Sequence, residues 1–466
     1  MVQGASSSAG KSLLVTALAR AFRRRGVDVV PFKAQNMSNN ARVARGGEIG
    51  AAQYLQALAA GVEPEVRMNP VLVKPEGETQ SQVVILGRPN LELSRLSWRE
   101  RSRFLWPVIE EALDGLRAEH DLILLEGAGS PAEINLRESD LANMQVARQA
   151  GARVLVVADI DRGGAFAHLY GTWALLPAGE QALISGFVLN KFRGDPSLLP
   201  PAPEQLQRLT GVPMLGVVPW LEHGLPDEDG AAAPSCRGGR SKVAVVRYPT
   251  ASNLDEFKQL EQVADVIWAG RPEHIVGADL VVLPGSKHVA DDLAWLHEAG
   301  LAQAVWARAR GGRAVLGICG GMQMLGMRVE GGGGLGGSGD GLGLLPLTTT
   351  FATRKQTRKT GTRFRRLSEP WAALAGREFH GYEIRHGDTT ATAPVAEALP
   401  DGLGFSGGPV LGIYLHGLFE QPDLLEALFG ARPTRSLDEA FDELADAVEE
   451  HLDVPALLGS LESARA

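Results

Sequence analysis

The 466-residue sequence contains very little cysteine and no long apolar run. Its two cysteines, Cys236 and Cys319, are too few for a disulfide framework, which indicates a reducing compartment. No stretch approaches the roughly 20 apolar residues that a membrane-spanning helix needs, and no signal-peptide pattern precedes the first motif. A repeat with the period of a solenoid is also missing. We therefore expect a cytoplasmic protein without a membrane partner.

Basic residues are fewer than acidic ones: the chain has 46 lysines and arginines and 55 aspartates and glutamates, which gives a net charge of −9. This balance argues against a general nucleic-acid or membrane-surface binder. One basic segment, Thr353–Arg366, is best interpreted as a solvated hairpin. The glycine-rich run Gly331–Gly341 is expected to be a mobile loop.

The chain is too long for one core, so we expect two or three domains. Short apolar runs rich in β-branched residues alternate with amphipathic stretches, which is typical of parallel sheets with crossover helices. In the first half these runs are Val27–Phe32, Leu122–Glu126, Val154–Asp159, Ile184–Asn190 and Gly216–Pro219, with a helix over Ser12–Arg25. In the second half they are Val243–Arg247, Leu280–Leu283, Ala314–Ile318 and Val410–Leu415.

The composition changes between these two halves. Residues 223–241 are polar, rich in glycine and proline, and aperiodic, which indicates a linker. The sequence therefore predicts an α/β domain over residues 1–222, a second α/β domain over 242–430, and a helical tail over 431–466. The pattern does not predict an oligomeric state.

A phosphate-binding loop is predicted near the start of the chain, at G-A-S-S-S-A-G-K-S (Gly4–Ser12). Backbone N–H groups in such a loop, with the N-terminus of the next helix, cradle phosphate oxygens. Gly10 would shape the turn, Lys11 would reach the β- and γ-phosphates of ATP, and the Ser12 hydroxyl would hold Mg²⁺. Only three residues precede the loop, so either its strand is very short or the natural start lies upstream, and the second is the expectation.

Three more side chains follow predicted strands of the first domain, where doubly wound sheets place their ligands. Glu126 is expected to bind Mg²⁺, although capping of a helix is the alternative. Lys33 could add positive charge to the transferring phosphoryl group. Asn190 is expected to contact the nucleotide base, with a simple turn residue as the alternative.

A nucleophile is predicted at Cys319 in G-I-C-G-G-M-Q (Gly317–Gln323). A strand running through a tight glycine turn into a helix exposes the thiol above the sheet, and the helix N-terminus favours the thiolate. His416 follows another apolar strand and is the expected base, and His386 is the competing candidate. Gly320 and Gly285 would supply oxyanion N–H groups, and Gln323 could bind the polar end of glutamine.

Together these features resemble the cobyric acid synthase family, glutamine-dependent enzymes of cobalamin biosynthesis. The resemblance covers essentially the whole chain. Besides the cysteine motif, it is carried by F-K-A-Q-N-M-S-N-N (Phe32–Asn40), M-N-P-V-L-V-K-P (Met68–Pro75) and D-I-D-R-G-G-A-F-A (Asp159–Ala167). It implies a dethiobiotin synthetase-like P-loop amidoligase domain followed by a class I glutamine amidotransferase domain.

The resemblance also implies a reaction. ATP would convert carboxylates b, d, e and g of adenosylcobyrinic acid a,c-diamide to acyl phosphates. Ammonia released from glutamine at Cys319 would then displace phosphate, after passing along the interface of the two domains. Asparagine, glutamine and charged side chains of the family motifs would bind the corrinoid, or else form a hydrogen-bonded loop scaffold: Gln35, Asn36, Asn39, Asn40, Asp161 and Arg162.

The sequence departs from related patterns in two places. Most class I amidotransferases have a glutamate two residues after the histidine, where this chain has Leu418, so the third triad member is left open and Glu420 is a guess. The family histidine after G-Y-E-I is replaced by Arg385. A sister amidase acting on other carboxylates is the alternative enzyme. A nucleotide switch with an inactive amidotransferase is the alternative class, and the Cys319–His416 pair argues against it.

Overall fold

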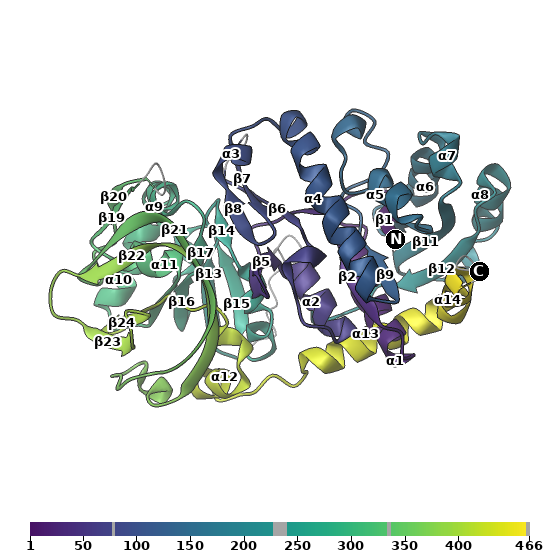
Figure 1. The fold of residues 1–466 in the computed structure, drawn as a ribbon. Helices are drawn as coiled ribbons and strands as arrows, with labels where there is room; N and C mark the ends of the chain where they lie inside the picture. Colours follow the sequence, from purple (N-terminus) through teal and green to yellow (C-terminus); the bar gives the residue numbers. More distant parts are fainter. Residues whose placement is uncertain (77–79, 227–239, 333–336, 463–466) are drawn as a thin grey trace.

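The computed structural model describes residues 1–76, 80–226, 240–332 and 337–462. Two α/β lobes lie side by side, and the C-terminal helices run back beneath the first lobe (Figure 1). Most of the predicted linker 223–241, with Cys236, and the centre of the glycine run 331–341 lie outside the described residues. In the part of the chain that is described, no helix combines the length and apolar character needed to cross a bilayer.

The first lobe is built on a parallel sheet. Its strands are β1 (Val2–Gly4), β2 (Val29–Phe32), β9 (Leu122–Leu125), β10 (Val154–Asp159), β11 (Ile184–Phe192) and β12 (Met214–Pro219). The order β1-β10-β11-β12 forms one ladder and β2-β9 another, and a parallel bridge from Val2 to Glu126 joins them. All six residues of β10 are buried, as expected for an apolar run in the middle of a parallel sheet. The predicted α/β class is thereby confirmed for this half.

Helices cover this sheet. They are α1 (Lys11–Arg24), α2 (Ala51–Ala60), α4 (Trp98–Glu119), α5 (Met144–Ala150), α6 (Ala165–Ala174), α7 (Ala178–Gln181) and α8 (Ala202–Thr210). Helix α1 begins after Gly10, which has a left-handed φ of 92°, and it buries Leu14, Leu18 and Phe22 at helical spacing. This start aims the first backbone N–H groups of the helix at the phosphate loop.

A smaller group of strands extends the first lobe toward the second. It comprises β3 (Gln35–Met37), β4 (Ala41–Ala44), β5 (Gly47–Gly50), β6 (Val71–Pro75), β7 (Ser81–Ile85) and β8 (Arg88–Asn90), with the short helix α3 (Leu91–Ser94). Strands β3, β6, β7 and β8 form one sheet, and β4 and β5 form a hairpin. Strand β4 contacts the second lobe through Arg42, which hydrogen-bonds to Asp255.

The second lobe has a seven-stranded sheet in the order β15-β13-β16-β18-β25-β24-β23. These strands are β13 (Lys242–Val246), β15 (Asp265–Ala269), β16 (Leu280–Leu283), β18 (Val315–Ile318), β23 (Ala396–Leu399), β24 (Gly404–Gly407) and β25 (Val410–Ile413). The ladder from β15 to β25 is parallel, so β16, β18 and β25 end at the same edge. Gly285, Cys319 and His416 follow these three ends. Helices α9 (Val289–Glu298), α10 (Leu301–Arg310), α11 (Gly320–Leu325) and α12 (Pro422–Phe429) pack around the sheet.

A second sheet of this lobe contains β19 (Arg328–Glu330), β20 (Gly339–Asp340), β21 (Leu347–Arg363) and β22 (Glu378–Ala391). Strands β21 and β22 pair antiparallel, and β21 carries most of the basic segment. The prediction of a fully solvated hairpin is wrong at Lys355, whose side chain is 7% exposed and pairs with Glu48 of the first lobe. Farther along, Arg358 and Arg363 are more than half exposed.

The predicted C-terminal tail forms α13 (Leu437–His451) and α14 (Val454–Glu462). Helix α13 lies along α1, and Phe441 and Leu444 join the same buried cluster as Leu14 and Leu18. Arg20 Nε also hydrogen-bonds to Asp442 Oδ1 at 2.7 Å. The tail therefore completes the core of the first lobe, although it follows the second lobe in sequence.

Short 3-10 helices and two-residue strands connect these elements. They are η1 (Val66–Met68), η2 (Arg137–Ser139), η3 (Pro196–Leu198), η4 (Leu254–Phe257), η5 (Leu260–Gln262), η6 (Pro272–His274), η7 (Ala372–Leu374), η8 (Leu418–Glu420), β14 (Ala251–Ser252) and β17 (Gly285–Ser286). Two of them, η4 and β17, contribute residues to the second lobe's candidate site.

Candidate active sites

Cys319 lies in a strained turn between β18 and α11. Its φ of 51° and ψ of −107° are rare for a residue with a side chain, as expected at a nucleophile elbow. The backbone packs so closely here that the nearby glycines leave no room for a side chain. A Cβ on Gly321 would lie 1.9 Å from Leu283 O, and one on Gly317 would lie 2.6 Å from Gly321 O. The thiol sulfur contacts Ile384 O at 3.7 Å. The turn thus holds the thiol at the edge of the sheet.

The predicted oxyanion groups lie beside this turn. A Cβ on Gly320 would lie only 2.6 Å from the Ser286 nitrogen, so the two backbones are in close contact. A Cβ on Gly285 would lie 3.0 Å from His416 Cε1. Strand β17 therefore places backbone groups next to both the nucleophile helix and the histidine, where an oxyanion hole requires them.

His416 lies close enough to Cys319 for the charge of the sulfur to raise the pKa of the imidazole. On its other side, His416 Nδ1 lies 2.8 Å from Glu256 Oε1, and the Gly417 N–H donates to Glu256 Oε2 at 2.8 Å. The carboxylate in contact with His416 is therefore Glu256, whereas Glu420, the guess from the sequence, pairs with Arg42 instead. Sequence reasoning missed Glu256, which lies in η4, 160 residues before the histidine.

The charge state of His416 follows from these neighbours. Burial disfavours the imidazolium, but the charges of Glu256 and Cys319 outweigh it and raise the pKa of His416 to about 10. His416 is therefore an imidazolium at neutral pH. Its Nδ1–H then donates to Glu256, which fixes the orientation of the ring.

His386 occupies a different position. Its Nδ1 lies 3.3 Å from Ala352 O, and burial, followed by the charges of Lys355 and Lys287, lowers the pKa of His386 to about 4. Its backbone oxygen accepts a hydrogen bond from Gln323 Nε2 at 3.0 Å. The structure therefore pairs the cysteine with His416, and holds His386 neutral behind Gln323.

The neighbouring Arg385, which replaces the family histidine, contacts other side chains of the second lobe. Its guanidinium lies 3.9 Å from the ring centroid of Tyr414, and its Nε donates to Glu383 Oε2 at 2.9 Å. It still lines the cavity next to the thiol.

A cavity of about 50 Å³ lies next to Cys319. Gln323 and Ser286 from the second lobe line it, together with Asn39 and Lys74 from the first. Lys74 is buried and pairs with Glu48, which also binds Lys355 across the interface. Residues of both lobes therefore enclose the space beside the nucleophile.

The phosphate loop of the first lobe lies between β1 and α1. Lys11 Nζ lies within hydrogen-bonding distance of Ser6 O at 3.4 Å and Gly129 O at 3.2 Å. Asn190 Nδ2 donates to Ala9 O at 2.9 Å. A Cβ on Gly10 would lie 2.1 Å from the same Asn190 nitrogen. The Asn190 amide thus supports the loop, where the sequence suggested contact with a base.

Glu126 closes the floor of this site and is 1% exposed. It accepts hydrogen bonds from Ser12 Oγ at 2.8 Å and Lys33 Nζ at 2.7 Å through Oε1, and from Gln56 Nε2 at 2.5 Å through Oε2. Within the described part of the chain, Gln56 Oε1 is buried and has no hydrogen-bond partner. One carboxylate, a hydroxyl and a spare amide oxygen suit Mg²⁺, which prefers oxygen ligands and retains waters.

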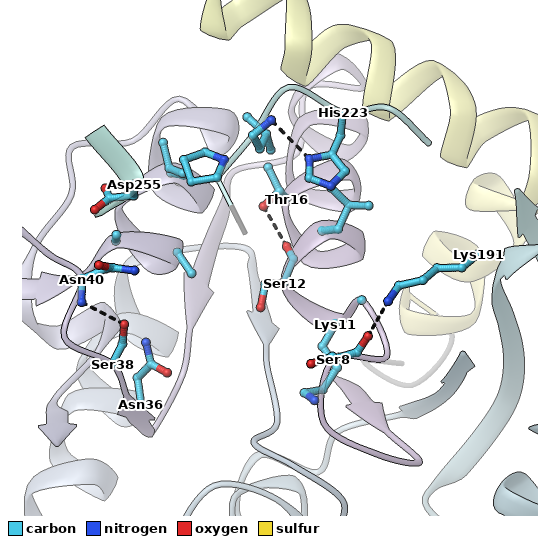
Figure 2. A pocket seen from close by; sticks show the side chains of 17 residues that line it. Ser8, Lys11, Ser12, Thr16, Asn36, Ser38, Asn40, Lys191, His223 and Asp255 are labelled. Atoms are coloured by element: carbon cyan, nitrogen blue, oxygen red, sulfur yellow. Dashed lines mark hydrogen bonds between the residues drawn. The ribbon is translucent and has the colours of Figure 1, made fainter. Parts of the chain in front are cut away.

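A cavity of about 410 Å³ opens above the loop. Figure 2 shows Ser8 and Lys191 on one side of it, and Asn36, Asn40 and Asp255 on the other. Lys191 Nζ donates to Ser8 O at 2.7 Å. Asp255 belongs to the second lobe, so this cavity also has walls from both lobes.

A further cavity of about 390 Å³ also borders the loop, and Gln35, Lys33, Asn36 and Trp98 line it. Of the family-motif residues, Asn36 therefore borders both spaces around the loop. Asn40 Oδ1 accepts a hydrogen bond from Leu254 N at 3.0 Å.

Asp161 and Arg162 lie apart from these two cavities. They follow β10 at the surface, where Arg162 Nε lies 3.4 Å from Asp159 Oδ2 and Arg193 Nε lies 3.6 Å from Asp161 Oδ1. Neither residue is among those lining the two cavities. The structure thus places Asn36 and Asn40 at the cavity above the loop and Asn39 at the cavity beside Cys319, and it leaves Asp161 and Arg162 outside these cavities.

Known proteins match both lobes. Residues 1–225 match the family described as CobQ/CobB/MinD/ParA nucleotide binding domain, and residues 242–424 match the CobB/CobQ-like glutamine amidotransferase domain. A cobyric acid synthase of Polaromonas sp. is 52% identical, over 99% of this chain and 97% of the relative. Those of Variovorax paradoxus and Paracidovorax citrulli are 54% and 55% identical, covering 98% and 97% of this chain and 98% and 96% of the relatives. The chain belongs to the cobyric acid synthase family.

Proposed function

We propose that the protein amidates carboxylates b, d, e and g of adenosylcobyrinic acid a,c-diamide, with ATP as activating agent and glutamine as nitrogen donor. The observation that carries this proposal is the pairing of a phosphate loop and a Cys319–His416–Glu256 triad on two lobes that jointly wall the space beside the thiol. Each centre supplies one half of the chemistry. The reaction would take place in the cytoplasm, where ATP and reduced thiols are available.

Glutamine hydrolysis occurs at the triad. The Cys319 thiolate attacks the side-chain amide carbon of glutamine, and the oxyanion that forms lies at the Gly320 N–H and a backbone N–H of the turn that begins at Gly285. The His416 imidazolium gives its proton to the departing nitrogen, so that the C–N bond breaks and neutral ammonia leaves. Water then attacks the thioester, glutamate is released and the thiol is regenerated.

Activation of the acceptor occurs at the phosphate loop. A corrinoid carboxylate oxygen attacks the γ-phosphorus of ATP, ADP leaves, and an acyl phosphate forms. Lys11 and Lys33 bring positive charge to the site where negative charge develops. Mg²⁺ held by Ser12 and Glu126 would neutralise phosphate charge when bound. Ammonia then attacks the acyl carbon, phosphate leaves with the bridging oxygen, and an amide remains.

Ammonia has to travel between these centres. Asn39 lines the cavity beside Cys319, and its neighbours Asn36 and Asn40 line the cavity above the phosphate loop. Among the described residues, Asn39 Oδ1 is buried without a hydrogen-bond partner, so it can accept one from ammonia. The loop over residues 36–40 is therefore the proposed passage. A route inside the interface keeps ammonia from water and from protonation.

Two variants separate the half-reactions. Cys319→Ser should lose glutamine-dependent amidation and keep amidation with added ammonium salt, because the phosphate loop is intact. Lys11→Ala should lose amidation with either nitrogen source, while glutamine hydrolysis persists. The measurement is mass spectrometry of the corrinoid, with glutamate and ADP assayed in parallel. Ammonia-dependent activity in Lys11→Ala, or its loss in Cys319→Ser, would count against this division of labour.

A further inference from the structure

Arg42 crosses from the first lobe into the second. It belongs to β4, its side chain is 8% exposed, and its guanidinium binds two carboxylates of the second lobe. Arg42 Nε donates to Asp255 Oδ2 at 2.7 Å, and Nη1 donates to Glu420 Oε2 at 2.8 Å. A fork that engages two carboxylates holds its partners in a defined geometry.

The same guanidinium lies over the ring of Tyr382, 5.1 Å from its centroid. The Tyr382 ring also stacks on that of His416, with centroids 5.3 Å apart and an interplanar angle of 22°. The backbones of Tyr382 and His416 exchange two hydrogen bonds, of 3.2 and 2.9 Å. The position of His416 therefore depends on Tyr382, which Arg42 covers.

A second connection runs through η4. Asp255, which Arg42 binds, is adjacent in sequence to Glu256, which binds His416. The N–H of Leu254 donates to Asn40 Oδ1 at 3.0 Å. The segment that orients the imidazole is thus tied to the first lobe on the N-terminal side of Glu256.

Asn253 strengthens this connection. Its Nδ2 donates to Ala41 O at 2.8 Å and to the Tyr382 hydroxyl at 2.9 Å. Three consecutive residues of the first lobe, Asn40, Ala41 and Arg42, therefore contact the second lobe's η4 and Tyr382.

We propose that Arg42 is a positioning residue for glutamine hydrolysis, which acts from the first lobe by fixing Tyr382 and the Glu256 segment against His416. This inference rests on the proposed hydrolysis of glutamine at Cys319. It assigns part of the amidotransferase site to the synthetase half of the chain. Arg42 is not among the residues that line the cavity beside the thiol, and it acts only through its neighbours.

The ionisable groups around His416 determine what a variant should change. Glu256 from η4, Cys319 before α11 and Tyr382 from β22 face the imidazole, and Asp255 and Glu420 lie behind Tyr382 with Arg42. Burial raises the pKa of Asp255 against the opposing charge of Arg42. Removing the guanidinium leaves the carboxylates of Asp255 and Glu420 without their cation. The Tyr382 ring is then no longer held against His416, and the negative charge near the imidazole is no longer compensated.

The test uses the full chain and compares Arg42→Met with the wild type in glutamate release and in ammonia-dependent amidation. We expect kcat for glutamine hydrolysis to fall about 10- to 100-fold, by analogy with the loss of an outer partner of a metal-ligating histidine, with little change in KM. The pH profile of hydrolysis should also shift. Ammonia-dependent amidation should continue. Arg42→Lys, which keeps the charge and loses the planar fork, should restore part of kcat.

Arg20→Met is the matched control, because Arg20 also joins distant parts of the chain, through Asp442 of α13, and lies away from both sites. It should leave kcat for glutamine unchanged. If Arg42→Met does not fold, the double variant Arg42→Met/Asp255→Asn, which removes the buried partner charge as well, replaces it. A kcat and pH profile equal to those of the wild type in the folded variant would overturn the inference. A wild type that hydrolyses no glutamine would instead overturn the proposed function.

Discussion

Glu256→Gln is the most instructive perturbation of the triad. The wild-type carboxylate accepts from His416 Nδ1 through Oε1 and from the Gly417 N–H through Oε2. A glutamine side chain has one oxygen and one amino group, so it can accept only one of these two bonds without placing donor against donor. The substitution keeps the volume of the side chain. It therefore removes the charge and one hydrogen bond with little change in packing.

The size of the effect follows from the distance. Unit charges about 4 Å apart attract each other by about 4 kcal/mol at an effective dielectric constant of about 20. Because one pKa unit corresponds to about 1.4 kcal/mol, loss of the carboxylate should lower the pKa of His416 by about three units. The wild-type pKa of about 10 would thus fall to about 7. The imidazolium of the variant is then lost as the pH rises through the neutral range.

The assay is glutamate release by the full chain across the neutral and alkaline range. The alkaline limb reports loss of the imidazolium, so it should move to lower pH by about three units in Glu256→Gln. Alkylation of Cys319 by iodoacetamide, followed by peptide mass spectrometry, reports the thiolate independently. Glu273→Gln is the matched control and should keep the wild-type limb, because Glu273 is exposed and pairs with Arg271 at the surface. Superimposable profiles for Glu256→Gln and wild type would refute the assignment of Glu256.

Two further variants test other contacts of the structure. Glu48→Gln leaves Lys74 and Lys355 buried without their shared carboxylate, and should lower the free energy of unfolding by about 3–5 kcal/mol, whereas Arg363→Gln, at an exposed pair, should change it by at most about 1 kcal/mol. The measurement is the melting temperature of each variant by calorimetry. Equal shifts for Glu48→Gln and Arg363→Gln would contradict a stabilising role for the buried Glu48 carboxylate. Glu126→Gln should raise the Mg²⁺ concentration that half-saturates ammonia-dependent amidation about 10- to 100-fold. An unchanged Mg²⁺ requirement would exclude Glu126 as a ligand.

Much of the fold could be predicted because its signals are local. Apolar runs such as Val154–Asp159 became fully buried parallel strands with the predicted bounds, since a strand covered on both faces needs apolar residues throughout. The glycine turn around Cys319 was also visible, because close packing against Leu283 leaves no room for a side chain. Such features depend on neighbouring residues, and the sequence contains them directly.

What could not be predicted depends on contacts between distant segments. Glu256 lies in a 3-10 helix with no periodic pattern, and only packing of η4 against the strand ends brings it to His416. Lys355 lies in a basic strand that looks solvated, and it is buried where it pairs with Glu48 of the other lobe. The hydrogen bond from Asn190 to the phosphate loop likewise became visible only once β11 was placed beside it.

The most direct test of the proposed reaction is mass spectrometry of adenosylcobyrinic acid a,c-diamide incubated with the protein, ATP, Mg²⁺ and glutamine. The account predicts four successive mass steps, each exchanging a carboxylate hydroxyl for an amino group, with one glutamate and one ADP released per step. An unchanged corrinoid mass, or amidation confined to cobyrinic acid that still lacks its a and c amides, would contradict it.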